Sequence, residues 1–390
     1  MVKVCLAAAA LGVGVGLAAS DATAESLDQK WGSDWPFSGI ATFAHLDHVK
    51  CLVNPDAPFD IGVIGAPFDT TTSYRPGARF GPRAIRVSSA RQSSIRSFNY
   101  RAGINPYRSW ARVLDCGDIP ITSWDNALAL RQMTDAFFEL GSRQTPNGRL
   151  SVREYRRKPK LMTMGGDHSI LLPILRALHA IYGRPLSVLH FDAHMDTRNP
   201  AKYIKAWVDA DDLSTQSFFN HGSMLWLASK EGLVANASSV HAGLRARIND
   251  YTDFDDDTDQ GWHRIFVDDI DDMGVSGVIE SILNRVGSQN PVYISVDIDV
   301  IDPGSAPGTG TPEPGGWTTR ELIRILRGLE NLNIVGADVV EVSPSYDAGE
   351  ITSLAAAQIM FELITNMVKR GTVDVPKYSS SGVNINRDEL

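Results

Sequence analysis

The stretch Leu186-Ser-Val-Leu-His190-Phe-Asp192-Ala-His194-Met-Asp196 begins as a short apolar run and ends in carboxylates and an imidazole. A second stretch, Val292-Tyr-Ile-Ser-Val-Asp297-Ile-Asp299, follows the same plan. Short apolar, β-branched runs are typical of buried strands, so the charged side chains stand at strand ends. An ionised carboxylate there is costly unless a cation or a full set of hydrogen bonds compensates it. The two stretches therefore predict a metal site in an α/β fold.

The spacing within each stretch supports convergence on one site. Side chains two residues apart on a strand share a face, with their Cα atoms roughly 6.6 Å apart. A third apolar run closes with Met164-Gly-Gly-Asp-His168-Ser169 and brings a second imidazole to the same kind of position. The three motifs together supply six candidate metal ligands: His168, Asp192, His194, Asp196, Asp297 and Asp299.

The charge of this set predicts two cations. Four carboxylates carry about four negative charges at neutral pH, which two divalent ions would cancel while both imidazoles stay neutral as ligands. Oxygen-rich ligation with imidazole and no thiolate favours Mn²⁺, with Zn²⁺, Fe²⁺ or Co²⁺ as alternatives and Mg²⁺ less suited.

The three motifs, in this order, closely resemble those of the ureohydrolases, the family of arginases, agmatinases and guanidinobutyrases. The resemblance covers roughly residues 58–370. It implies a three-layer α/β/α domain with an eight-stranded parallel sheet, two Mn²⁺ per subunit, and a homo-oligomer, either a trimer or a hexamer. It also implies a partition of the ligands. One ion would take His168, Asp192, Asp196 and Asp299, and the other would take or share His194, Asp192, Asp196, Asp297 and Asp299.

Hydrophobic periodicity alone predicts the same class of fold. Helical spacing occurs between many of the short apolar runs, and alternating strands and helices indicate a parallel sheet covered on both faces. Ligands of such sheets bind beyond the carboxyl ends of the strands, where the charged motifs fall. The predicted strands are residues 60–65, 111–116, 161–164, 186–191, 239–244, 264–267, 292–296 and 334–342. The predicted helices include 125–142, 169–182, 318–329 and 351–369.

A pair of divalent cations lowers the pKa of a water shared between them and so favours hydrolysis. A guanidinium carbon is a poor electrophile, so the substrate plane must be fixed, and a carboxylate can accept two guanidinium N–H groups at once. Glu341, at the end of the last apolar strand, matches the family position with this role. By resemblance, Asp196 relays a proton to the leaving amine, and His221 lies at the mouth of the site as an acid or proton shuttle.

Loop sequences such as His221-Gly-Ser-Met and Gly308-Thr-Gly-Thr-Pro-Glu313-Pro-Gly-Gly resemble agmatinases more than arginases. Agmatine, split into putrescine and urea, is therefore the first expectation for a small cationic guanidino substrate. Arg198 leaves guanidinobutyrate open as a second choice, because it could bind a carboxylate or repel the distal amine of agmatine. Arginine comes third, and a catalytically silent metal-containing binding protein is the rival from another class.

The termini predict a protein of the secretory pathway. Residues 1–24 have Lys3, an apolar stretch and then Ala22-Thr-Ala24, the pattern of a cleaved signal peptide, so no membrane attachment is expected after cleavage. The last residues, Arg387-Asp-Glu-Leu390, resemble a retrieval signal of the endoplasmic reticulum, which leaves lumenal retention and secretion open. Residues 25–57 are predicted as an N-terminal extension, 58–371 as the ureohydrolase domain and 372–390 as a polar tail.

The net charge of −9 argues against a nucleic-acid partner and suits a cationic substrate. Cys51 and Cys116 remain after signal cleavage. They could pair in an oxidising lumen, but Cys116 lies within an apolar run, and a buried free thiol is the expectation there. Asn236-Ala-Ser238 is a glycosylation sequon, which the secretory context makes relevant.

Overall fold

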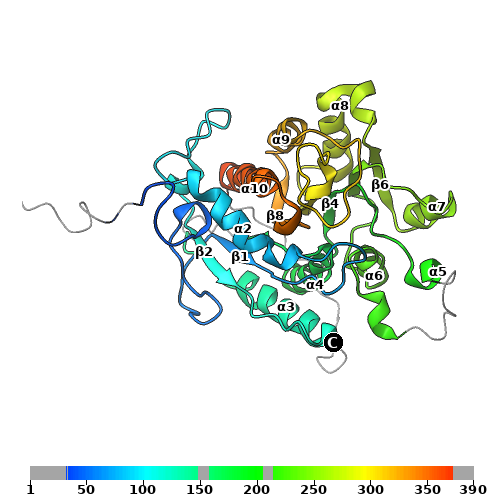
Figure 1. Ribbon diagram of the computed structural model, residues 1–390, viewed down its shortest axis with the longest axis horizontal. Coiled ribbons are helices and arrows are strands. Elements are labelled where there is room, and N and C mark those ends of the chain that lie inside the picture. The colour runs from blue at the N-terminus through cyan, green and yellow to red at the C-terminus, as the bar shows by residue number, and fades with distance from the viewer. Residues whose placement is uncertain (1–31, 33, 148–157, 205–213, 372–390) are drawn as a thin grey trace, which may run out of the picture. The chain divides into compact units, whose positions relative to one another are not determined.

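A single parallel sheet of eight strands organises the chain from Ile40 onward (Figure 1). The computed structural model describes residues 32, 34–147, 158–204 and 214–371. The spatial order of the strands is β2-β1-β3-β8-β7-β4-β5-β6, and every neighbouring pair runs parallel. The strands are β1 (Ile61–Gly65), β2 (Val113–Asp118), β3 (Lys160–Met164), β4 (Ser187–Phe191), β5 (Ser239–Leu244), β6 (Trp262–Phe266), β7 (Pro291–Asp297) and β8 (Asn333–Val340).

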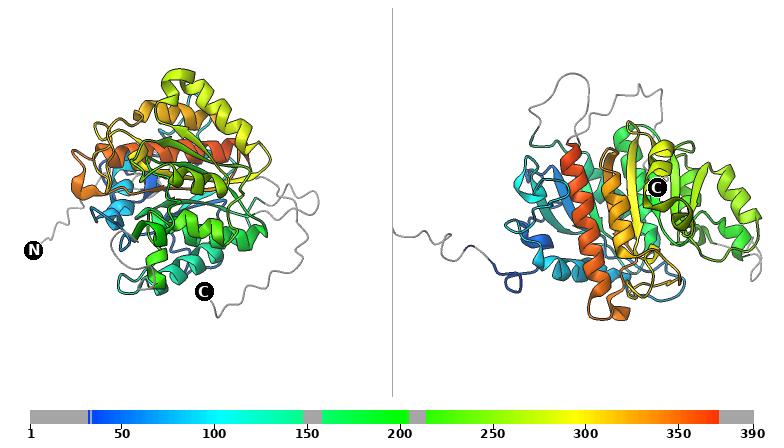
Figure 2. Two further views of the ribbon diagram at one scale, coloured as in Figure 1. Left: turned by 90° about the vertical axis from the view of Figure 1, so that its right-hand side faces the viewer. Right: turned by 90° about the horizontal axis from the view of Figure 1, so that it is seen from above.

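Helices cover both faces of this sheet, as the layers in Figures 1 and 2 show. One layer contains α3 (Asn126–Gly141), α4 (Leu171–Tyr182) and α6 (Met224–Lys230), which pack on one another in that order. The other layer contains α2 (Gly81–Ser88), α8 (Asp269–Val286), α9 (Thr319–Gly328) and α10 (Ile351–Arg370). Two short helices, α5 (Pro200–Ile204) and α7 (Thr252–Asp259), lie after β4 and β5. The result is a three-layer α/β/α domain, as predicted.

The helices that flank the central strands have sequence-encoded ends. A reciprocal capping box starts α9, because the Thr318 hydroxyl accepts the Glu321 N–H while the Glu321 carboxylate accepts the Thr318 N–H. Gly183 ends α4 with a φ of 67°, a left-handed conformation that glycine adopts at low cost. Local sequence therefore sets where α9 begins and where α4 ends before β4.

All eight predicted strands are present, with ends displaced by two residues at most, and the four predicted helices are present as α3, α4, α9 and α10. The central strands are buried on both faces, which is why they read as continuous apolar runs. Helix α10 is long and apolar enough to cross a membrane, but 83% of its most hydrophobic window is buried. It contacts β8, α2 and α9 and is a core helix of this domain.

The segment from Ile40 to residue 57, part of the predicted N-terminal extension, packs as part of the large unit. Phe43 and Ala44 are fully buried. The Phe43 N–H donates to the Asp115 carboxylate on β2 (2.8 Å), and the Ala44 N–H donates to Ser89 Oγ (2.8 Å). Buried hydrogen bonds of this kind fix the segment along the sheet edge.

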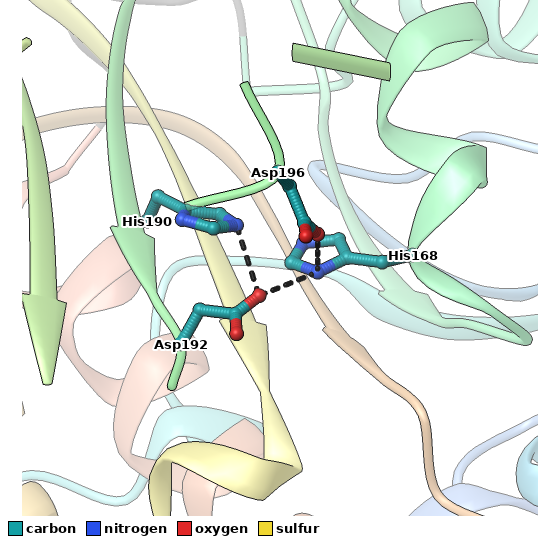
Figure 3. Close-up of side chains that lie close together, drawn as sticks. All are labelled: His168, His190, Asp192 and Asp196. Carbon is teal, nitrogen blue, oxygen red and sulfur yellow. Dashed lines mark ion pairs between the residues drawn. The ribbon is translucent and has the colours of Figure 1, made fainter. Parts of the chain in front are cut away.

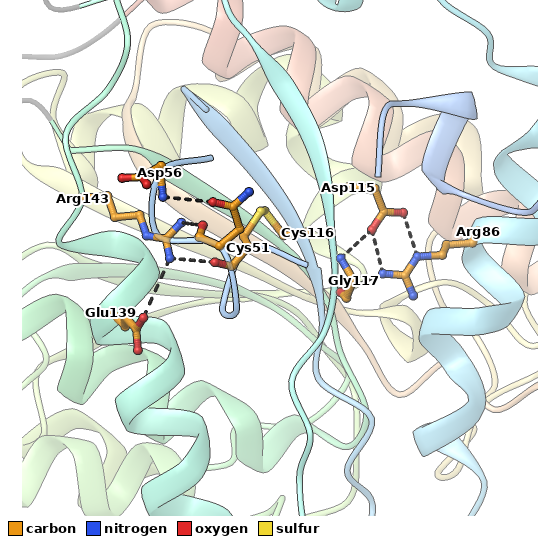
Figure 4. The surroundings of a disulfide bond; sticks show 9 residues. Cys51, Asp56, Arg86, Asp115, Cys116, Gly117, Glu139 and Arg143 are labelled. Atoms are coloured by element: carbon orange, nitrogen blue, oxygen red, sulfur yellow. Dashed lines mark hydrogen bonds and ion pairs between the residues drawn. A yellow bond between two sulfur atoms is a disulfide. The ribbon is translucent and has the colours of Figure 1, made fainter. Parts of the chain in front are cut away.

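Cys51 and Cys116 form a disulfide, so the expectation of a free thiol at Cys116 is wrong (Figure 4). The segment before Cys51 runs beside β2, where the Val49 N–H donates to the Asp115 carbonyl (3.0 Å) and the Asp115 N–H donates to the Asp47 carbonyl (3.0 Å). This pairing brings the two cysteine Cα atoms to 5.0 Å, within the range of a disulfide. The apolar run around Cys116 gave no sign of this partner, because it lies far away in sequence.

The predicted signal peptide and the predicted polar tail fall outside the described residues. In the unit Met1–Gly39, the described rings of Trp35 and Phe37 stack on each other, with centroids 6.2 Å apart.

Candidate metal centre

Four adjacent strands of the sheet bring the predicted site residues together. Strands β3, β8, β7 and β4 are neighbours in the sheet, and each motif follows the carboxyl end of one of them. His168 follows β3, Asp192 follows β4, Asp297 closes β7 and Glu341 follows β8. Parallel strands deliver their carboxyl ends to one edge, so residues far apart in sequence meet here.

Backbone N–H groups orient the carboxylates. One oxygen of Asp192 accepts the His194 N–H (2.6 Å), one of Asp297 accepts the Asp299 N–H (2.8 Å), and one of Asp299 accepts the Ala193 N–H (3.1 Å). In each case the other carboxylate oxygen, Oδ2, faces an imidazole. The tight turns after β4 and β7 therefore aim three charged oxygens at one region.

The first group of side chains surrounds His168 (Figure 3). Its Nδ1 lies 3.0 Å from Asp192 Oδ2 and 3.3 Å from both Asp196 Oδ2 and Asp297 Oδ2. His168 is fully buried, and its Nδ1 and Asp192 Oδ2 lack an aligned hydrogen bond to any described residue. Unpaired buried polar atoms are costly, so atoms that converge in this way suit a cation between them.

The second group surrounds His194, whose Nδ1 lies 3.2 Å from Asp192 Oδ1 and 3.1 Å from Asp299 Oδ2. Asp192 thus offers one oxygen to each group. The grouping differs from the expected partition, because Asp297 lies beside His168 and Asp299 lies beside His194. Strand-end spacing identifies the residues but not how their side chains divide, because that depends on the turns after each strand.

Electrostatics also favours cations at this edge. Burial, and then the charges of Asp299 and Asp192, raise the pKa of Asp297 well above its usual range. Burial and the charge of Asp192 raise the pKa of Asp299 to about 6. Buried carboxylates repel one another in this way unless cations neutralise them. The donor set therefore fits a divalent metal site.

The sequence did not assign His190 to the site, yet its ring lies within it (Figure 3). His190 Nε2 is 3.1 Å from Asp192 Oδ2, and the His190 ring stacks on that of His168 with centroids 4.7 Å apart. Nitrogen or oxygen atoms of His168, His190, Asp192 and Asp196 all lie within 4.8 Å of one another. The signal was available, because His190 precedes Asp192 by two residues and so shares its face of the strand.

Glu341 lies beside the first group in a buried position. Its Oε1 accepts the His168 backbone N–H (2.9 Å) and faces His221 Nδ1 (3.1 Å), whereas its buried Oε2 has no hydrogen-bond partner among the described residues. A Cβ on Gly310 would lie 3.3 Å from this oxygen, so the glycine keeps the approach open. One carboxylate oxygen is fixed and the other is available.

Two site residues adopt left-handed backbone conformations that residues other than glycine rarely adopt: Asp196 (φ 56°) and Glu341 (φ 61°). Such conformations cost on the order of 1–3 kcal/mol and persist where the surroundings enforce them. Sequence periodicity carries no sign of either.

His221 bridges Glu341 and the loop after β1. Its Nδ1 faces Glu341, while its Nε2 lies 2.8 Å from Ser73 Oγ and 3.0 Å from the Ser73 N–H. Burial lowers the pKa of His221, but Glu341 and the nearby Asp196 outweigh this and raise it to about 9. The Ser73 N–H needs a lone pair on Nε2 and so favours a neutral ring that donates from Nδ1 to Glu341.

Comparison with known proteins agrees with this geometry. The arginase family model matches residues 59–365. The chain is 48% identical to "Putative agmatinase 3" of Schizosaccharomyces pombe, covering 85% of this chain and 81% of the relative. It is 36% identical to a guanidinobutyrase of Pseudomonas aeruginosa, covering 85% of this chain and 94% of the relative. The structure of proclavaminate amidinohydrolase from Streptomyces clavuligerus aligns with a TM-score of 0.72 at 35% identity, covering 87% and 100% of the two chains.

The parallel eight-stranded sheet, the His/Asp cluster at its carboxyl edge and these relatives together define a metal-binding hydrolase that acts on C–N bonds of amidines. The chain belongs to the arginase family.

Proposed function

We propose that the protein hydrolyses a linear guanidino compound to urea and an amine, with agmatine, split into putrescine and urea, as the preferred substrate. The observation that carries the proposal is the buried Glu341 Oε2, which has no hydrogen-bond partner among the described residues and belongs to a carboxylate beside the His/Asp cluster. A guanidinium group supplies the N–H donors and positive charge that this oxygen lacks.

Two Mn²⁺ ions per subunit are proposed to occupy the cluster. His168, Asp192, Asp196 and Asp297 would hold one, and His194, Asp192 and Asp299 the other. When bound, the ions would supply Lewis acidity and lower the pKa of a coordinated water. Asp192 is the natural shared ligand, because its two oxygens face different imidazoles.

The protein's own residues would bind and orient the substrate. Glu341 accepts guanidinium N–H groups through Oε2, while the His168 N–H and His221 hold Oε1 in place. This grip fixes the plane of the guanidinium, so its central carbon presents a face to the metal cluster. Glu341 needs no rearrangement to do so, because two contacts and the backbone turn already define its position.

Proton transfer completes the reaction. Water adds to the guanidino carbon, the bond from that carbon to the substituted nitrogen breaks, and this nitrogen must gain a proton to leave as an amine. Asp196, whose Oδ2 faces the centre and whose side chain is slightly exposed, is proposed to carry that proton from the water to the nitrogen. His221, between Glu341 and Ser73, is proposed to exchange protons at the mouth.

A substrate panel tests this proposal. The manganese-loaded mature chain is offered agmatine, 4-guanidinobutyrate and arginine separately, and urea is measured with an Asp297→Ala variant as the control. We expect urea from agmatine at the highest kcat/KM and none from the variant. A higher kcat/KM for 4-guanidinobutyrate would make that compound the preferred substrate. No urea from any of the three would contradict the proposed hydrolysis.

We further propose that the protein acts in the secretory pathway, either in the lumen of the endoplasmic reticulum or outside the cell, after removal of residues 1–24. The Cys51–Cys116 disulfide supports this location, because such bonds persist in oxidising compartments and are rare in the cytosol.

A homo-oligomer, trimer or hexamer, is proposed from family resemblance, and light scattering after gel filtration tests it.

A further inference from the structure

A buried chain of polar side chains extends from the metal centre toward the edge of the sheet. His190 Nδ1 lies 2.9 Å from His241 Nδ1, and His241 Nε2 lies 3.1 Å from Asp257 Oδ1. His190, His241 and Asp257 are all fully buried. The register of the sheet builds the chain, because His190 on β4 pairs with His241 on β5. Asp257 reaches it from α7.

The far end of the chain is well anchored. Asp257 accepts the Thr197 hydroxyl (2.7 Å) through Oδ1 and Arg264 Nη1 (2.7 Å) through Oδ2. The His241 ring also stacks on Trp262, with centroids 4.0 Å apart. Because Asp257 is a fixed acceptor, it draws the proton of His241 to Nε2 and leaves Nδ1 as an acceptor. The acceptor at Nδ1 then takes the Nδ1–H of His190.

This order of donors leaves the lone pair of His190 at Nε2, pointing into the first group of the metal centre. His190 Nε2 and Asp192 Oδ2 are 3.1 Å apart, yet neither forms an aligned hydrogen bond to a described residue. His168 Nδ1 likewise forms no aligned hydrogen bond to a described residue. Two imidazole lone pairs and a carboxylate oxygen repel one another at this separation unless a cation lies among them.

A similar chain of polar contacts holds His168. Its Nε2 contacts Ser295 Oγ (2.8 Å), and the Ser295 hydroxyl donates to Asp338 (2.7 Å). Both imidazoles therefore connect through one intermediate side chain to a buried carboxylate. Histidines that bind metals usually donate their other ring N–H to such a partner, which fixes the tautomer and the ring orientation.

We propose that His190 belongs to the metal-binding group beside His168, and that the His241–Asp257 relay is a positioning device that holds its Nε2 toward the cation. This rests on the proposed metal centre and extends it by a third imidazole. His241 and Asp257 act through His190 and are positioning residues only.

The test measures manganese affinity of the metal-free full-length mature chain by calorimetry, so it requires no turnover. His241→Phe keeps an aromatic ring on Trp262 but removes both relay hydrogen bonds. We expect it to raise the Kd of one manganese about 10- to 100-fold. His241→Asn places an amide near the position of Nδ1 and is expected to recover part of the affinity. At His190 itself, His190→Phe is expected to weaken binding more than His190→Gln, which retains a ligand atom.

His263→Phe is the matched control, since His263 lies on the adjacent strand and bonds to Ser281 outside the relay. Its manganese Kd should equal that of the wild type. The melting temperature of each metal-free variant separates a folding defect from an affinity effect. If His241→Phe lowers that temperature but keeps the wild-type Kd, the relay is only structural and the inference is overturned. A wild-type chain that binds no manganese would overturn the metal centre itself.

Discussion

Glu341 is the residue on which substrate recognition depends. Its backbone adopts a φ of 61°, its Oε1 is held by two donors and its Oε2 has no partner among the described residues. A residue held in a strained conformation, with one oxygen held ready for a ligand, is preorganised for binding. Removing its charge should therefore affect substrate and leave the metals in place.

We expect Glu341→Gln to lower kcat/KM for agmatine on the order of 100-fold, because a charge-assisted hydrogen bond to the guanidinium is lost. Initial rates of urea release measure the change, and metal content after dialysis checks that both ions stay bound. Glu330→Gln, at a partly exposed site that pairs with Lys369, is the matched control and should retain wild-type kinetics. Equal kcat/KM for Glu341→Gln and wild type would contradict the role.

Arg198 allows a second test at this scale. Its guanidinium donates to the Arg247 carbonyl (3.0 Å), and it lines a cavity of about 570 Å³ with Met195 and Ala246. Agmatine has no carboxylate, so its binding does not need the positive charge of Arg198. Arg198→Ala should then leave kcat/KM for agmatine within about threefold of wild type. A selective loss of 4-guanidinobutyrate hydrolysis in that variant would show that Arg198 binds a carboxylate.

At the scale of elements, the disulfide links the segment 40–57 to the edge strand β2. It closes a loop with a sequence separation of 65 residues. We expect Cys51→Ser to lower the free energy of unfolding by about 2–4 kcal/mol, mainly because the unfolded chain gains freedom. Guanidinium chloride denaturation measures this difference. Reducing agent should destabilise the wild type by a similar amount and leave the variant unchanged. A wild type whose stability is unaffected by reducing agent would contradict a stabilising role for the disulfide.

Strand β3 begins with a buried lysine. Burial, and then Arg370, lower the pKa of Lys160 to about 7, and its Nζ donates to the Gly371 carbonyl (3.1 Å). Between pH 7 and about 10.5 the unfolded chain keeps a proton that the folded chain has released, so stability rises with pH in this window. The slope for this group is at most about 1.4 kcal/mol per pH unit.

Lys160→Met should remove this dependence. The wild type is expected to gain stability relative to the variant as the pH rises from 7 to 10, as measured by thermal unfolding across that range. Lys369→Met, at a partly exposed site that pairs with Glu330, is the matched control and should follow the wild-type slope. A wild type and Lys160→Met with parallel profiles would mean that Lys160 stays charged when folded.

At the scale of the whole molecule, the apolar runs and helical spacing predicted the sheet, its strands and the edge where ligands bind. The meeting of the six candidate ligands was predictable because each lies in a motif at the carboxyl end of an apolar run, and five of them recur at a spacing of two. Strand order and register were not, and they place His241 beside His190 and Asp257 beyond it. The disulfide and the division of carboxylates between His168 and His194 also depend on long-range packing, which local patterns do not encode.

Removal and return of the metal test most directly whether a two-cation centre hydrolyses a guanidino compound. The direct test strips the purified mature chain with chelator, adds back Mn²⁺ in known ratios and follows urea release from agmatine. We expect no urea without metal, a rise that levels off at two ions per chain, and no activity from Asp297→Ala at any ratio. Urea release by the stripped chain, or full manganese binding without urea from any guanidino substrate, would contradict it.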